Sequence, residues 1–453
     1  MVLRSFLSAL TGGFTGSNVT TFINLKYSKE KTSEEPRDDL SKLDLEEAEE
    51  ISPTLHLNRE LRPQIPLIGI GGTGLRLLDR IVHRVNNYKM IYPVLGIDTS
   101  EADLYKYPNI SHTYHIPGSE LGTGHQYRKA ATRTNGAKEE IKSEITKYLA
   151  ALKMKYNHEM VFLLLGAGGT GVGAGIEIAK LLIEMGKRPV PFLILPAKEE
   201  MSRIRFNAAA ALYHFSYAPK DRCLNLTTIC IDNELFLTKN TKNNYKSVIS
   251  AANERITATM ADLIAATELE SHAYSADLNE FLEIFRDLKG IGVLQYFQTE
   301  ETGKRLVKLF EDNLEDSLSM DIDIFTATRG YLYLSSNTGL ITSEEYRNLM
   351  LQFDNADIFN KLHEINREVN FYAIRGIYTG ISYPDNIQQL MQLAEDARVT
   401  VLNRELDRNA TSRGNPKIDQ LNDDEELEVK TGQELADTRA EEYAKMRREG
   451  DIS

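Results

Sequence analysis

The chain has 453 residues, of which 42% are hydrophobic, and its formal net charge is −13. This length allows about two to three domains around a large buried core. The negative charge argues against general binding to nucleic acid, whose phosphates are held mainly by Lys and Arg. The chain contains no run of roughly 18 apolar residues, so no transmembrane helix is expected.

The first 60 residues are expected to form a flexible arm. Met1–Gly16 has a short apolar patch broken by Gly12 and Gly13, too brief for a secretory signal, while contact with a membrane surface stays open. Residues 29–59 are rich in charge, Ser and Pro and bury too little apolar area to order themselves. Cys223 and Cys230 are not spaced as paired metal ligands, and they fit the reducing environment of a cytoplasmic protein.

Residues 61–242 are predicted to form a doubly wound α/β domain. Short apolar runs alternate there with helix-length segments, and near-continuous apolarity is typical of parallel strands covered by helices on both faces. The runs are Pro66–Ile70, Val94–Ile97, Val161–Leu165, Phe192–Leu195 and Thr228–Ile231.

A long central helix is predicted in residues 243–270, because apolar residues recur at helical spacing. Beyond it, β-branched and aromatic residues gather in three runs, which indicate a smaller α+β domain at 271–408. These runs are Ile291–Gln298, Ile324–Ser335 and Val369–Ser382. Residues 409–453 carry Gly, Pro and mixed charge, so we expect a linker and a charged tail that is solvated or binds an adaptor protein.

Two glycine-rich turns each follow a predicted strand and open a predicted helix. They are GIGGTG at 69–74 and GAGGTGVGAG at 166–175. Glycine permits close backbone approach, and the N–H groups at a helix N-terminus attract anions, so these turns predict a phosphate cradle. The first turn alone would also fit an NAD-dependent oxidoreductase or a plain strand–helix turn. The second argues against an oxidoreductase, which needs only one such loop. The candidate phosphate-binding residues are Gly71, Gly72, Thr73, Gly168, Gly169, Thr170, Gly171 and Gly173.

The stretch Ala167–Gly173 resembles the signature of the tubulin/FtsZ GTPases, small-Gly-Gly-Thr-Gly-small-Gly. Val172 departs from it, since the family usually has Ser, Ala or Thr there. The resemblance covers about residues 65–293. It implies that the chain binds GTP or GDP together with Mg²⁺, although no residue is assigned as a metal ligand.

The same resemblance implies nucleotide contacts in later segments. Residues 93–100 resemble the strand and loop after the first helix, and GSELGTG at 118–124 resembles the loop that closes over the terminal phosphate. The implied contacts are Asp98, Gly122, Gly124, Glu200, Arg203, Asp232, Asn233 and Asn253. Asn253 would read guanine or, alternatively, face solvent. Tyr245 lies off the spacing of the family's stacking aromatic, a position that Ile249 occupies.

Residues Ser275–Glu280 resemble the Asn-x-Asp-x-x-Asp loop that a neighbouring subunit inserts into the nucleotide site. Asp277 and Glu280 are therefore the catalytic candidates, although an acidic helix start would look the same. The resemblance implies that hydrolysis is completed where subunits meet and that the chain forms a head-to-tail homopolymer.

Residues 231–235, together with Leu195 and Pro196, look closer to TubZ-type plasmid-partition proteins than to division FtsZ. The resemblance thus implies a cytomotive filament that positions plasmid or phage DNA without contacting it directly. The alternatives are an FtsZ-like division or cell-shape filament, a non-polymerising membrane-associated relative and, more distantly, the oxidoreductase.

Overall fold

The computed structural model describes residues 64–392, with gaps at 87–89, 91, 119–121, 155–156, 158, 218–222, 241–243, 270–275, 287, 301–303, 354–355, 366–368, 383, 385–386 and 391. The expected N-terminal arm, linker and charged tail lie outside the described residues. The chain divides into two compact units, Met1–Pro384 and Asp385–Ser453. The elements named below belong to the first unit. Within the described part, no helix is both long and apolar enough to span a bilayer.

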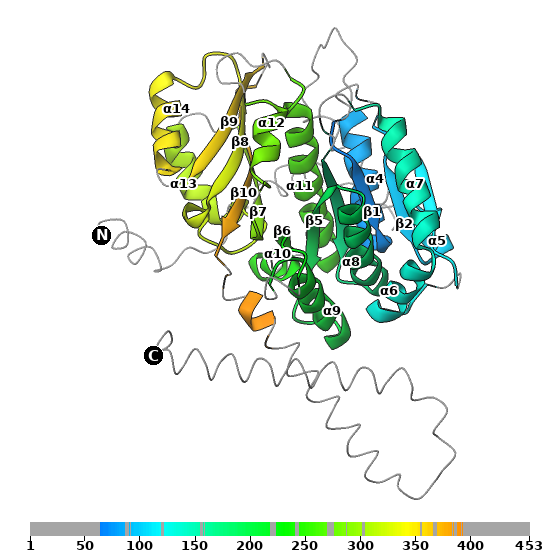
Figure 1. The fold of residues 1–453 in the computed structure, drawn as a ribbon. Coiled ribbons are helices and arrows are strands. Elements are labelled where there is room, and N and C mark those ends of the chain that lie inside the picture. The colour runs from blue at the N-terminus through cyan, green and yellow to red at the C-terminus, as the bar shows by residue number, and fades with distance from the viewer. Residues whose placement is uncertain are drawn as a thin grey trace, which may run out of the picture. The chain divides into compact units, whose positions relative to one another are not determined.

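A ten-stranded sheet runs through the first unit (Figure 1), in the order β3-β2-β1-β4-β5-β6-β7-β10-β8-β9. Neighbouring strands are parallel from β3 to β7. Strand β10 is antiparallel to β7 and β8, and β9 is parallel to β8. The strands are β1 (Leu67–Ile70), β2 (Leu95–Asp98), β3 (His112–His115), β4 (Met160–Gly166), β5 (Arg188–Leu195), β6 (Thr227–Asp232), β7 (Gly290–Thr299), β8 (Arg329–Ser336), β9 (Asp357–Glu364) and β10 (Tyr372–Ile381).

Helices cover both faces of the parallel part, as its doubly wound pattern predicts. Phe162 and Leu164 of β4 join the core formed with α4 and α11, whereas Leu165 faces Gly175 of α8 on the other side. The helices are α4 (Gly71–Asn86), α5 (Glu101–Leu104), α6 (Tyr127–Gly136), α7 (Lys138–Leu152), α8 (Gly169–Glu184), α9 (Ser202–Leu212), α10 (Asn233–Lys239), α11 (Tyr245–Ala266), α12 (Leu278–Glu283), α13 (Leu306–Ser317) and α14 (Ser343–Met350).

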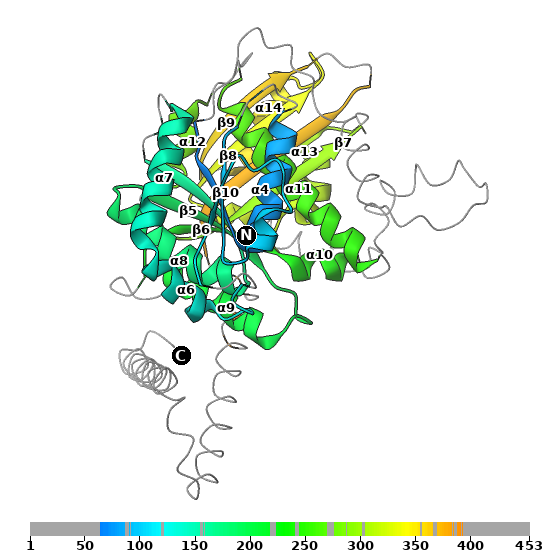
Figure 2. The same ribbon diagram turned by 90° about the vertical axis from the view of Figure 1, so that its right-hand side faces the viewer.

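The long helix α11 is the predicted central helix, and it joins the two parts of the sheet. It packs against α4 and against β7 and β10. Asp262, in its second half, accepts a hydrogen bond from Arg375 Nε on β10 at 2.8 Å and lies 3.4 Å from Arg84 Nε on α4. Because one carboxylate meets both arginines, α4, α11 and β10 share a buried ionic contact. Figure 2 shows α4 beside α11.

The sequence predicted most strands, and the differences lie near the edges. Strands β3 and β9 were not predicted, because their polar sequences, HTYH and DIFNKLHE, lack an apolar run and both strands lie at sheet edges. The run predicted as one strand at 324–335 begins instead with a 3₁₀ turn, Ile324–Thr326, capped by Asp323, and β8 starts only at Arg329. The expected change of pattern after α11 falls within one continuous sheet.

Candidate functional site

The two glycine turns meet at the carboxyl ends of adjacent parallel strands. Strands β1 and β4 pair from Leu67↔Phe162 to Ile70↔Leu165, so both turns follow the same ends of these strands. Gly71 has φ +72°, and a Cβ there would lie 2.8 Å from the backbone nitrogen of Gly171. The two turns therefore touch through their backbones, an approach that only glycine permits.

Two glycines of these turns face open space. A Cβ added at Gly72 or at Gly168 would meet no other atom within 4 Å. Both glycines lie at the N-terminal ends of 16-residue helices, α4 and α8, where unpaired N–H groups carry partial positive charge. Thr73 and Thr170 lie in the same two turns. The phosphate cradle stays a prediction, supported by the open backbone at these two glycines and by the two helix N-termini.

Gly169 and Gly173 serve a different purpose from Gly168. A Cβ at Gly169 would lie 2.7 Å from Thr123 Oγ1, and one at Gly173 would lie 1.9 Å from the carbonyl oxygen of Tyr127. These two predicted phosphate-binding glycines therefore let α6 and the segment before it pack onto α8, and their α-carbons face protein.

Asp98 and two threonines form a polar cluster beside the second turn. The Oγ1 atoms of Thr99 and Thr170 are 2.6 Å apart and buried. Asp98 is 2% exposed; its Oδ1 accepts from Ser100 N–H at 3.0 Å, and its Oδ2 is buried without a hydrogen-bond partner among the described residues. Burial raises the pKa of Asp98 to about 6. An orphaned carboxylate oxygen next to hydroxyl oxygens fits a hard cation such as Mg²⁺.

The predicted glycine loop lies against the same cluster. A Cβ on Gly122 would be 3.7 Å from Thr99 Oγ1, whereas Gly124 faces open space; residues 119–121 lie outside the described residues. Asn207 of α9, 1% exposed, donates through Nδ2 to the carbonyls of Ala167 at 3.2 Å and His125 at 3.0 Å. It ties the second turn to this loop. Asn207 was not predicted from the sequence, although an amide within the alanine-rich stretch FNAAAAL was a usable signal.

The candidates for sugar and base surround the start of α11. Glu200 accepts a hydrogen bond from Ala197 N–H at 3.0 Å, and Arg203 is exposed. Tyr245, the first residue of α11, is 58% exposed. Burial of part of its ring, together with the charges of Glu200 and Glu199, raises its pKa. Tyr245 therefore lies close to the Glu200 segment, with an open aromatic surface.

Two further candidates have structural partners of their own. Asp232 caps α10 by accepting from Glu234 N–H at 3.0 Å, and the half-buried Asn233 begins that helix. Asn253 is 7% exposed on α11, so the alternative of a solvent-facing residue is wrong.

The acidic pair lies near the opposite ends of the parallel strands from the glycine turns. Asp277 is the N-cap of α12 and Glu280 its third residue, and their side chains form a capping box; Ser275 lies outside the described residues. Farther along α12, Phe281 packs on Phe162 of β4, with ring centroids 6.2 Å apart. The chain beyond α12 reaches the residue before β4, where Arg286 Nε is 3.6 Å from a Glu159 carboxylate oxygen.

The length of β4 separates the two functional ends. Its seven residues span about 20 Å at roughly 3.3 Å per residue, with Glu159 before the strand and Gly166 at its end. Figure 1 shows the same separation, with α12 near one end of α11 and α10 near the other. The acidic pair of a chain therefore lies away from its own glycine turns.

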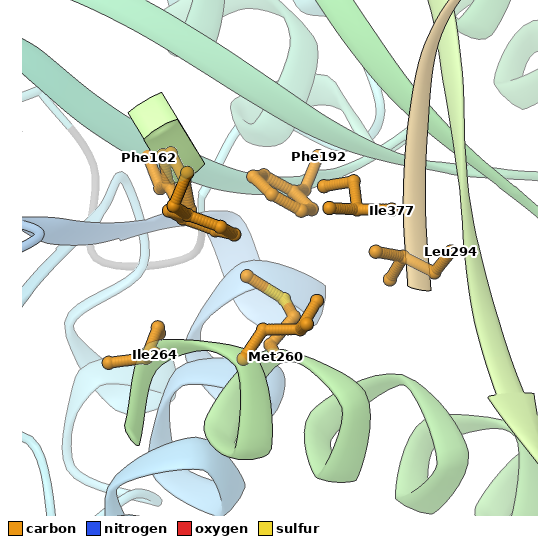
Figure 3. Close-up of a pocket in the computed structure, with 8 residues that line it drawn as sticks. Phe162, Phe192, Met260, Ile264, Leu294 and Ile377 are labelled. Atoms are coloured by element: carbon orange, nitrogen blue, oxygen red, sulfur yellow. The ribbon is translucent and has the colours of Figure 1, made fainter. Parts of the chain in front are cut away.

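A small apolar cavity lies between side chains of α11, α12 and the sheet (Figure 3). Its volume is about 10 Å³, roughly that of one water, and its apolar lining favours a dry site. It offers no group for chemistry. The labelled lining residues are Phe162, Phe192, Met260, Ile264, Leu294 and Ile377.

Comparisons with known proteins agree on one fold. No family model matches the chain. A curated relative, cell division protein FtsZ 1 of Pyrococcus woesei, is 25% identical over 281 residues, which cover 61% of this chain and 70% of the relative. Among solved structures, GDP-bound CetZ1 of Haloferax volcanii has a TM-score of 0.62 at 19% identity and covers 74% of this chain and 99% of its own. A GTPγS-form protofilament of TubZ from Bacillus thuringiensis serovar israelensis has a TM-score of 0.61 at 18% identity, with 80% and 99% covered.

Proposed function

Because this chain belongs to the tubulin/FtsZ superfamily, we propose that it is a GTPase that polymerises head to tail and hydrolyses GTP where two subunits meet. The observation that carries the proposal is the position of Asp277 and Glu280, which lie toward the opposite ends of the parallel strands from the glycine turns. A second subunit docked in the same orientation brings its acid end to the first subunit's cradle. Such a contact does not close on itself, so repetition gives a filament.

In this proposal the N–H groups at the starts of α4 and α8 hold the phosphates, with Gly72 and Gly168 facing them. Asp98 and Thr170 would hold Mg²⁺, which would neutralise charge on the terminal phosphates when bound. The buried hydrogen bond between Thr99 and Thr170 fixes the second hydroxyl beside Asp98. Gly122 and Gly124 let the chain close over the terminal phosphate.

Asp277 and Glu280 of the docked subunit then orient the attacking water. Phosphoryl transfer needs little covalent chemistry from the protein, so water positioning and charge stabilisation account for most of the catalysis. Because the capping box fixes both carboxylates at the start of α12, they enter the contact already ordered. The capping role predicted by the alternative interpretation is thus compatible with catalysis in trans.

We propose that the sugar and base lie between the start of α11 and the segments that carry Glu200, Arg203, Asp232 and Asn233. The exposed ring of Tyr245 offers a stacking surface there. The buried amide of Asn253 would read the edge of guanine. Tyr245 would then replace the aromatic residue that the family has four positions later, where this chain has Ile249.

The test of this function is assembly driven by nucleotide in the full-length protein. Light scattering and negative-stain images with GTP and Mg²⁺ should show filaments, while GDP should give few or none. Pelleting that does not depend on GTP would contradict the proposal, and hydride transfer from NADH without filaments would support the oxidoreductase instead.

For the cellular role, we propose a cytoplasmic filament that positions plasmid or phage DNA, supported by the resemblance of residues 231–235 to TubZ-type proteins. A fluorescent fusion expressed in the host should form moving filaments, and loss of the gene should cause plasmid loss. A ring at the division site would contradict this role and support the FtsZ-like alternative. Deletion of 432–453 should spare assembly and weaken binding of an adaptor.

A further inference from the structure

The edge strand β9 contacts the chain on both sides of the segment that joins α11 to the acidic pair. Lys361 Nζ donates to the carbonyl of Leu269, in the turn that follows α11, at 2.5 Å. The preceding residue, Asn360, accepts through its backbone oxygen from the N–H of Ala276 at 3.1 Å. Ala276 directly precedes Asp277. Two consecutive residues of β9 thus hold Leu269 and Ala276, the described residues on either side of 270–275.

A third contact holds the acid side of this segment. The hydroxyl of Tyr331 on β8 donates to the carbonyl of Ala276 at 3.4 Å, and its ring packs edge-on against Phe281 of α12 at 5.0 Å. Tyr331 is fully buried, and it pairs with Phe359 two residues before Lys361. The acidic pair is therefore positioned from β8 and β9, which lie far along the sheet from the glycine turns.

The burial of Lys361 is hard to explain by stability alone. Lys361 is only 2% exposed. A buried ammonium group is unfavourable unless it is hydrogen-bonded. Apolar residues of similar volume often replace buried ionic groups without loss of stability. A cation is, however, well suited to the carbonyl groups that follow a helix C-terminus, and here the ammonium holds the carbonyl of Leu269 in the turn after α11.

Resting on the proposed function, we propose that Lys361 is a positioning residue for GTP hydrolysis, which acts by fixing the end of α11 and hence the acids presented to the neighbouring subunit. Its side chain contacts the carbonyl of Leu269, and the backbone of the preceding residue, Asn360, holds Ala276 directly before Asp277. We expect a change at Lys361 to move Asp277 and Glu280 through these two attachments. A misplacement of about 1 Å in a catalytic group can reduce a rate by about a hundredfold.

The test compares Lys361→Met with a matched variant of the same strand, His363→Leu. Both change a buried polar side chain on one face of β9, but among the described residues His363 bonds Tyr333, on β8. We expect Lys361→Met to bind GTP with unchanged affinity, to form filaments, and to release phosphate about tenfold to a hundredfold more slowly per assembled subunit. His363→Leu should hydrolyse like wild type. Equal rates in Lys361→Met and wild type would overturn the proposal.

Tyr331→Phe provides a second variant that keeps the buried ring and removes only the hydroxyl bonded to Ala276. We expect a smaller decrease, a few-fold, in phosphate release per assembled subunit. If Lys361→Met does not fold, Tyr331→Phe decides the matter, because a wild-type rate in this variant would overturn the proposal.

A mixing experiment distinguishes a positioning defect from a general structural defect. Lys361→Met subunits keep an intact cradle, so adding Gly168→Leu subunits, which have a blocked cradle but intact acids, should raise phosphate release. Adding Glu280→Gln subunits should not raise phosphate release, because neither kind of subunit then presents a correctly placed Asp277 and Glu280 pair. No increase in the first mixture, with co-sedimentation verified, would overturn the proposal. If assembled wild type itself fails to hydrolyse GTP, the proposed function fails instead.

Discussion

Asp277 and Glu280 hold each other in place at the start of α12. Asp277 Oδ1 accepts from Glu280 N–H at 3.1 Å, and Glu280 Oε2 accepts from Asp277 N–H at 2.8 Å. This capping box explains how exposed carboxylates on a six-residue helix can be ordered before a partner arrives. It also means that removing either carboxylate affects local stability as well as charge, so the choice of substitution matters.

Glu280→Gln isolates the charge, because a glutamine side-chain oxygen can still accept from Asp277 N–H and preserve the capping box. We expect the free energy of unfolding to stay within about 0.5 kcal/mol of wild type and hydrolysis to fall by about 10²-fold or more, the scale of lost acid–base assistance. GTP binding should not change, and filaments should persist. Denaturant titration and phosphate release check both parts; wild-type turnover in this variant would exclude Glu280 from catalysis.

Gly168→Leu is the substitution that should block the phosphate cradle directly. Gly168 has φ −70° and ψ 171°, which leucine adopts readily, and a Cβ there enters open space between the turns. Calorimetry should show loss of GTP binding, whereas Gly136→Leu, also in open space but at the end of α6, should bind normally. Gly169 is less suitable, because a side chain there would displace the segment around His125. Unchanged affinity in Gly168→Leu would refute the cradle.

Asp98→Asn should stabilise the nucleotide-free protein at neutral pH. Burial raises the pKa of Asp98 from 3.8 to about 6, so the folded state binds this proton more tightly than the unfolded state. Stability therefore falls as pH rises from 3.8 to about 6, and the full loss is present above about 6. The variant should be more stable by up to about 3 kcal/mol at pH 7.5. This advantage should shrink as pH falls from 6 toward 3.8. Paired denaturant titrations check the trend; an equal advantage at pH 4 would contradict it.

Asp262→Ala should be strongly destabilising, because it leaves Arg375, which is 2% exposed, without its carboxylate. Loss of one partner of a buried pair costs about 3–5 kcal/mol. Glu254→Ala is the matched control, since Glu254 contacts Arg84 in the same network but has a side chain that is 42% exposed, and exposed pairs contribute at most about 1 kcal/mol. Similar losses of thermal stability in both variants would contradict this account.

The parallel strands, the central helix and the two glycine turns were predictable because each has a local signal, an apolar run, a helical period or a turn. The distinction between Gly168 and Gly169 was not, since it depends on Thr123 and His125, more than 40 residues earlier in the chain. Likewise, Lys361 lies in the polar sequence of β9, and only the structure shows that it is buried against the turn after α11. The roles of these residues depend on contacts between segments that are distant in the sequence, which local patterns do not reveal.

The most direct test of catalysis across the subunit contact is the GTPase rate per subunit measured over a range of total protein concentrations. If Asp277 and Glu280 act on a neighbour's nucleotide, dilute monomers should bind GTP but hydrolyse it very slowly. The rate per subunit should rise at the concentration where light scattering first reports filaments, and then level off. A rate per subunit that is the same below and above this concentration would show that each chain completes its own site, and would contradict the account.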